Sequence, residues 1–160
     1  MAQDIFLTLT GIHGESQDAH YPNAIEVLTW DWSIYQQSKM HLGSGGGTSK
    51  CTVDDLIFDH YVDCASPNLV EYCLTGKHIP EAVLVMRKAG GQALGYLKII
   101  MEDVIITRVS PAMFINMPLL REQINLSFTR IRHEYSIQNA QGGSAGTATA
   151  NYDIKANKVT

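Results

Sequence analysis

The chain has 160 residues, of which 45% are apolar and 18% are charged, and its formal net charge at pH 7 is −4. The apolar fraction excludes an intrinsically disordered chain, and the acidic balance argues against a nucleic-acid-binding protein, whose footprint is a basic domain. The length suits one domain spanning residues 1–160. Charged residues are fewer than the roughly 25% of an average soluble domain, which favours self-association.

The cysteines and the N-terminal residues lead us to expect a cytoplasmic product. Cys51, Cys64 and Cys73 show neither a CxxC motif nor zinc-site spacing, so we expect reduced thiols. The first residues do not contain a basic stretch followed by an apolar stretch, so we expect no secretory signal. Apolar runs stay far below the roughly 18 residues of a membrane span.

Strand signals dominate the chain. Ile5, Leu7 and Leu9 alternate with more polar positions and predict a first strand. A second signal covers residues 24–37, and its apolar phase changes after Val27, which predicts a β-bulge or a bend. Further signals cover residues 51–61, 81–88, 94–109, 122–137 and 151–155. The apolar phase slips again within residues 122–137. Long bent strands predict a barrel or a strongly curved sandwich.

One helix is predicted between Ser66 and Gly76. Ser66 is a good N-cap and Pro67 suits the first helical position, while Gly76 supplies a left-handed stop. The apolar stripe of this helix is formed by Leu69, Val70, Cys73 and Leu74. We therefore expect a short helix that lies against the sheet on one face.

Two segments have unusual composition. Residues 43–49 are rich in glycine and lack apolar side chains, so we expect a loop that is mobile or ordered by a partner. Residues 142–150 are small and polar, and we expect a flexible lead to the last strand.

Motifs with catalytic or ligand-binding chemistry are weak. Residues 142–146 match G-x-S-x-G, but no helix is expected to follow, as a nucleophile elbow requires. Residues 43–50 do not form a P-loop. The spacing of one acidic stretch fits no known metal site, and we interpret it as a solvated strand edge: Asp54, Asp55, Asp59, His60, Asp63 and Cys64. We therefore predict no catalytic residue, no metal and no cofactor. A hydrolase triad assembled from distant positions stays open.

Trp30 and Trp32 share one face of a strand. Core packing is the favoured interpretation. The alternatives are an intersubunit contact and a stacking platform for a sugar or a base, which would make the chain a soluble β-barrel ligand-binding module.

In its motifs and their order, the chain resembles the haemolysin-coregulated protein (Hcp) family, the tube subunit of bacterial type VI secretion systems. The resemblance runs from about Asp4 to Tyr135, with a looser echo in residues 151–158. The motifs that carry it are Gly14-Glu15-Ser16, Trp30-x-Trp32, the glycine loop of residues 40–50, Ser66-Pro67-Asn68-Leu69, Gly76-Lys77-His78, Arg87-Lys88-Ala89-Gly90-Gly91, Tyr96-Leu97, Glu102-Asp103-Val104 and Glu134-Tyr135.

The resemblance implies a mainly β fold, namely a β-barrel of two curved antiparallel sheets with one flanking α-helix, like phage tail-tube proteins. It implies no enzymatic activity. Six subunits would close into a ring, and rings would stack into a hollow tube that carries effectors and is expelled by a contractile sheath behind a spike. The protein would be cytoplasmic before firing and then secreted without a signal peptide. Residues 1–80 carry a formal −7 and residues 81–160 a formal +3, which suits head-to-tail stacking if the two halves form different faces.

The resemblance also assigns site residues. It implies a ring-stacking loop formed by Gly43, Ser44, Gly45, Gly46, Gly47, Thr48, Ser49 and Lys50. If the two tryptophans enter the core, alternation sends Thr29, Asp31 and Ser33 to the opposite, polar face. We predict that this face lines the lumen and contacts cargo.

The chain departs from the family pattern after Ser110. Many relatives have a Gly/Ser loop there, whereas residues 111–118 are apolar here. We expect this segment to be buried against the barrel or against a neighbouring subunit.

Overall fold

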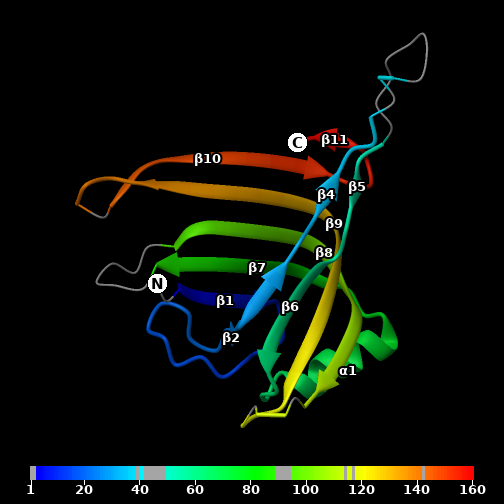
Figure 1. Cartoon of the computed structure of the whole chain (residues 1–160), viewed down its shortest axis with the longest axis vertical. Coiled ribbons are helices and arrows are strands. Elements are labelled where there is room, and N and C mark those ends of the chain that lie inside the picture. Colours follow the sequence, from blue (N-terminus) through cyan, green and yellow to red (C-terminus); the bar gives the residue numbers. More distant parts are fainter. Residues whose placement is uncertain are drawn as a thin grey trace.

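The computed structural model describes residues 3–38, 40–41, 50–88, 95–113, 115–116, 118–141 and 143–160. Across these residues the chain is mainly β with one α-helix, and all paired strands are antiparallel (Figure 1). The elements in chain order are β1 (Gln3–Leu9), β2 (Ile25–Glu26), β3 (Thr29–Asp31), β4 (Ile34–Tyr35), β5 (Thr52–Val53), β6 (Leu56–Tyr61), α1 (Ser66–Thr75), β7 (Ile79–Lys88), β8 (Gly95–Ala112), β9 (Arg121–Gln138), β10 (Ser144–Asp153) and β11 (Lys158–Val159).

The long strands β8 and β9 organise the fold. They pair with each other along their length, and β8 also pairs with β7. The first half of β9, from Arg121, pairs with β6, whereas the second half, to Gln138, pairs with β10. A register shift between Ile106 and Arg108 lies where the partner of β9 changes. The two strands therefore curve along their length, and β6 and β10 lie on different parts of the nine-stranded main sheet (Figure 1).

The segment from Ile25 to Asp31 completes the circuit of backbone pairing. β2 pairs with β1, and the Val27 amide then donates to the Ile5 carbonyl at 2.9 Å. The next amide, of Leu28, donates to the Asp59 carbonyl at 2.8 Å, and β3 pairs with β6. The change of apolar phase after Val27 marks the point where the pairing partner of this segment changes from β1 to β6, which confirms the predicted bend.

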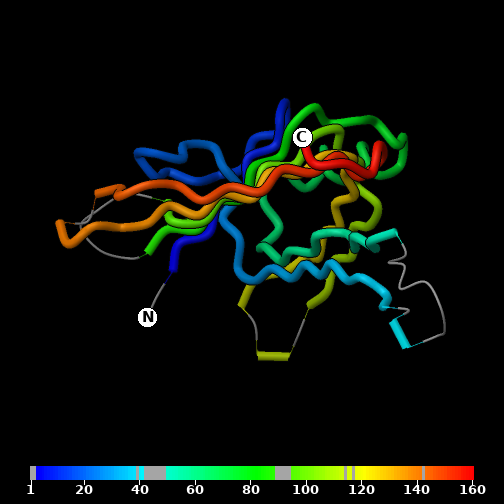
Figure 2. Tube along the Cα trace, turned by 90° about the horizontal axis from the view of Figure 1, so that it is seen from above, coloured from blue at the N-terminus to red at the C-terminus, as the bar shows by residue number. Residues whose placement is uncertain are grey.

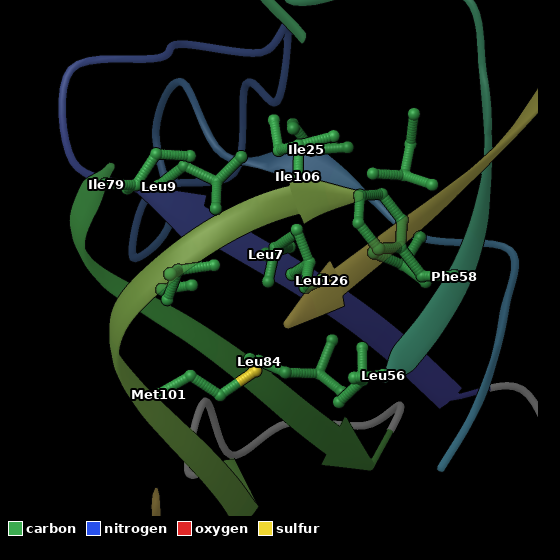
Figure 3. Packing of buried hydrophobic residues seen from close by; sticks show 14 of the residues in the cluster. Leu7, Leu9, Ile25, Leu56, Phe58, Ile79, Leu84, Met101, Ile106 and Leu126 are labelled. Carbon is green, nitrogen blue, oxygen red and sulfur yellow. The ribbon is translucent and has the colours of Figure 1, made fainter. Parts of the chain in front are cut away.

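One core fills the space enclosed by the curved main sheet and α1. Its fully buried members come from strands far apart in the sequence (Figure 3) and from α1, and the largest are Leu7, Ile25, Leu56, Phe58, Leu69, Ile79, Leu84, Ile99, Met101, Ile106, Ile124 and Leu126. The alternating burial along β6 and along the first half of β9 shows that each strand presents one face to this core. The predicted fold class is confirmed.

The helix begins one residue earlier than predicted. Ala65 occupies the N-cap position without a side-chain cap, and Ser66 is the first helical residue. The Ser66 hydroxyl accepts a hydrogen bond from the Asp63 amide at 3.1 Å, so it caps the preceding turn. Gly76 ends the helix with φ 68°, as predicted.

The buried face of α1 is narrower than the predicted stripe. Leu69 is fully buried, and Tyr72 and Cys73 pack against the core. Val70 is 41% exposed and Leu74 is 82% exposed, because they follow the core-facing Leu69 and Cys73 and lie about 100° around the helix from them. The stripe prediction was wrong for these two residues, which leaves apolar side chains on the surface.

Two other segments differ from the predictions. The expected flexible lead of residues 142–150 is mostly the strand β10, which pairs with β9 and carries a register shift between Ser144 and Gly146. In the described part of the apolar segment after Ser110, Met113 is 74% exposed and Ile115 is 93% exposed, so these two side chains are not buried against the barrel. In the described part of the chain, no helix is long and apolar enough to cross a membrane.

Candidate functional site

The strand β3 separates an apolar face from a polar one. Trp30 and Trp32 pack against the core, and the Trp32 indole lies 6.2 Å from the Phe128 ring. Trp32 Nε1–H also donates to the Asp54 carbonyl at 3.0 Å. Both tryptophans therefore serve the core, as the favoured interpretation held, and this arrangement does not present them as a stacking platform.

The opposite face is polar and hollowed. Thr29, Asp31 and Ser33 are all exposed there, as alternation predicts. The Thr29 hydroxyl donates to Asp59 Oδ2 at 3.0 Å, and Arg121 donates to the same oxygen at 2.9 Å. Two neighbouring hollows of about 240 and 360 Å³ lie on this face, and both are lined by Asp59 and Gln123.

A two-stranded arm projects from the body of the molecule. It is formed by β4 and β5, which pair Ile34 with Val53 and stand apart from the main sheet (Figures 1 and 2). Ile34 is 53% exposed and Tyr35 is 56% exposed. Lys50 of the predicted stacking loop is exposed, and the rest of that loop, residues 43–49, lies outside the described residues.

The main sheet ends in strands with open edges. On one side, β11 covers only Tyr152 and Asp153 of β10, and residues 144–150 of β10 are exposed. On the other side, β2 pairs with Phe6 and Leu7 of β1, the Val27 amide donates to the Ile5 carbonyl, and Leu9 bridges to Ile12, so the open part of β1 is its start. Unpaired strand edges present rows of free amides and carbonyls that can pair with another chain.

A charged cluster anchors the long loop between β1 and β2. The Arg87 guanidinium donates to Asp18 Oδ2 at 2.6 Å and to Asp4 Oδ2 at 2.9 Å, and it stacks over the Phe6 and Tyr21 rings. The hydrogen bond from Arg87 holds the pKa of Asp18 at about 2, and these carboxylates raise the pKa of Arg87. This cluster ties the loop to β1 and β7.

A buried polar cluster lies where β6 ends and α1 begins. His60 is fully buried and Glu122 is 3% exposed. Glu122 Oε1 lies 2.8 Å from His60 Nε2 and accepts the Ser66 hydroxyl at 2.6 Å. Burial by itself raises the pKa of Glu122, but the hydrogen bonds from His60 and Ser66 outweigh it, so this pKa lies below its usual value. Burial also raises the pKa of Asp63.

This cluster is not among the sequence predictions, which place His60 and Asp63 in a solvated strand edge. The signal was the alternation along β6, which puts His60 on the same face as Phe58. Glu122 could not be found without the register, which places it opposite His60. Asp54 is exposed, in agreement with the predicted solvated edge, and Asp59 lies on the opposite face of β6 from His60.

The cluster has the residue types of a hydrolase triad without its geometry. In a triad, the serine hydroxyl is hydrogen-bonded to one nitrogen of the imidazole and the carboxylate is hydrogen-bonded to the other. Here Ser66 and His60 bond to the same oxygen of Glu122. Among the described residues, no group of three His, Cys, Asp or Glu side chains could hold a metal ion.

Comparison with known proteins identifies relatives over the whole chain. Residues 6–135 match the family model described as type VI secretion system effector, Hcp. Protein hcp1 of Pseudomonas aeruginosa is 39% identical over 147 residues, which cover 91% of each chain. The crystal structure of Hcp1 from Salmonella typhimurium is 51% identical, with a TM-score of 0.83 and full coverage of both chains.

A further solved structure, of a type VI secretion system effector from Yersinia pestis, is 42% identical with a TM-score of 0.78. It covers 94% of this chain and 99% of its own.

Proposed function

Since the chain belongs to the Hcp family of type VI secretion proteins, we propose that it is a structural tube subunit and not an enzyme. Each chain forms one domain, which spans residues 1–160. Six copies of this domain form a ring. Rings stack into a hollow tube that carries effectors. The tube forms in the cytoplasm, inside a contractile sheath and behind a spike, and is secreted when the sheath contracts.

The open edges of the main sheet carry this proposal. The exposed part of β10 and the start of β1 lie at opposite ends of the strand order. A contact between two different edges is heterologous, and a heterologous contact that closes on itself makes a ring. The exposed part of β10 is built from small Gly, Ala, Ser and Thr side chains, which allow close approach of a neighbouring strand.

The ring faces are the surfaces that stack. The β4–β5 arm extends beyond the body of the subunit and carries the apolar Ile34 and Tyr35. The stacking loop, Gly43 to Lys50, follows directly from this arm. Its glycines let one backbone approach another closely, so we assign it to the contact with the next ring.

The polar face of β3 forms the lumen wall in this proposal. Thr29, Asp31 and Ser33 are small or acidic and exposed, while the tryptophans are withdrawn into the core. Six copies of Asp31 around a bore make its potential negative, although water and salt screen the charges beyond about 8 Å. Such a wall favours cargo that slides past it without adhering.

The edge contact can be tested with two proline variants, Thr147→Pro and Ala148→Pro. Successive amides of a strand point to opposite sides, so one of these prolines removes a β9 hydrogen bond and the other removes an amide from the open edge. We expect one variant to keep a near-wild-type melting temperature, and that variant should lose the hexamer in size-exclusion chromatography. If the fold-preserving proline variant still forms hexamers, β10 is not the ring contact.

A further inference from the structure

An exposed apolar patch lies where β8 passes into β9. Its described members are Val62, Met113, Ile115, Leu119 and Leu120. The Val62 amide donates to the Leu120 carbonyl at 2.9 Å, which joins the end of β6 to this segment. Soluble monomers rarely leave large apolar patches in contact with water, so the patch indicates a surface that a partner covers.

A hollow of about 360 Å³ adjoins the apolar patch. Val62 and Leu119 belong to the patch and also line this hollow. Its lining also contains three carboxylates, which belong to Glu15, Glu26 and Asp63. The partner that fits this surface therefore presents apolar side chains together with positive charge.

The β4–β5 arm has both of these properties. Ile34 and Tyr35 are more than half exposed, and Met40, which follows β4, is 72% exposed. Residues 32–53, which contain the arm, include two lysines and no aspartate or glutamate. These are two of the three Lys or Arg residues between positions 1 and 80, and one of them, Lys50, is exposed just before β5. The arm is therefore a positive, apolar element within the acidic half of the chain.

The arm and the acidic hollow lie at opposite ends of the molecule. In Figure 1 the arm extends from the upper end, whereas the end of β6 and the connection from β8 to β9 form the lower end. The arm of one copy can therefore meet only the hollow of another copy. A contact between two such different surfaces is heterologous, and when it does not close on itself it continues as an open stack.

We propose that the apolar patch and the acidic hollow receive the β4–β5 arm of a subunit in the next ring. Lys50 then lies beside the carboxylates, and the apolar side chains of the arm pack against Val62 and Leu119. This inference rests on the proposed tube function and names the surface that receives the arm. It also gives a role to residues 111–118, which depart from the family pattern, because their apolar side chains add a burial to the stack that a Gly/Ser loop does not supply.

Photo-crosslinking from position 119 identifies the occupant of the hollow. The chain is produced in a bacterium with an active type VI secretion system, with p-benzoylphenylalanine in place of Leu119, whose side chain is 55% exposed. We expect a product of two subunits, in which the captured peptide of the second copy lies within residues 32–53. The same probe in place of Leu74, which is 82% exposed on α1, is the matched control and should not capture that segment. A peptide from another part of the second copy, a different protein, or the absence of a two-subunit product overturns the proposal.

A second experiment separates this contact from the ring itself. Leu119→Asp should keep the hexamer in size-exclusion chromatography and lower secretion of the protein at least tenfold, since burial of one leucine side chain changes an equilibrium constant by about tenfold or more. Leu74→Asp alters another exposed leucine and should be secreted like the wild type. Hexameric Leu119→Asp that is secreted normally shows that only the receiving surface is wrong, and loss of the hexamer in this variant places Leu119 within the ring contact, which also overturns the inference. A wild-type chain that stays monomeric overturns the proposed function as well.

Discussion

Replacing Trp32 with alanine tests whether Trp30 and Trp32, at β3 and directly after it, pack in the core or bind a ligand. Trp32 packs against Phe128 and donates one hydrogen bond to the Asp54 carbonyl. A fully buried Trp→Ala change costs about 3–5 kcal/mol, and a net hydrogen bond contributes about 1 kcal/mol. Because Trp32 is only partly buried, we expect a loss of about 2–4 kcal/mol, which lowers the melting temperature by roughly 5–12 °C in a chain of this size.

The matched controls lie on the same segment. Asp31→Ala and Ser33→Ala alter exposed side chains on the opposite face, so each should change stability by at most about 0.5 kcal/mol. All melts are compared at one protein concentration, because assembly stabilises the folded state by mass action. If Trp32→Ala melts like the wild type while Asp31→Ala does not, the assignment of the two faces is wrong.

Two further predictions concern the loop anchor and the lumen. Arg87 holds the pKa of Asp18 at about 2, below its ordinary 3.8. The stability from this pair is therefore present above about pH 4 and is lost as the pH falls toward 2. In thermal melts followed by circular dichroism, the melting temperature of Asp18→Asn should fall less than that of the wild type over this pH range. Asp31→Arg should leave the hexamer intact and change the retention of effectors, as measured by co-purification and secretion assays, and normal export of every effector would contradict the lumen assignment.

Local sequence patterns predicted two kinds of feature. These are strands in which apolar and polar side chains alternate, and helix ends that are marked by residues such as glycine. Alternation along β1 and β3 placed Leu7 in the core and Trp30 against it. Gly76 adopts the left-handed conformation that its position at the end of α1 predicted. These features depend on neighbours in sequence, so one strand or one helix contains all the information they need.

Features that depend on distant partners could not be predicted. The small, polar residues of β10 have weak strand propensity, and they form a strand because β9 offers a partner along its second half. Glu122 and His60 are in contact because the register of β6 with β9 places them opposite each other. They are far apart in the sequence, so no local pattern indicates this pairing. The apolar composition of residues 111–118 predicted burial against the barrel or against a neighbouring subunit. Ile115 is exposed, so it is not buried against the barrel. Burial against a neighbouring subunit stays a prediction.

The mass and shape of the purified protein distinguish a ring-forming tube subunit from a monomer. Size-exclusion chromatography with light scattering, at micromolar concentration and near-neutral pH, should give a mass near six times 17.7 kDa. Negative-stain images of the same fraction should show rings with a central hole. A stable monomer under these conditions would contradict the tube-subunit account.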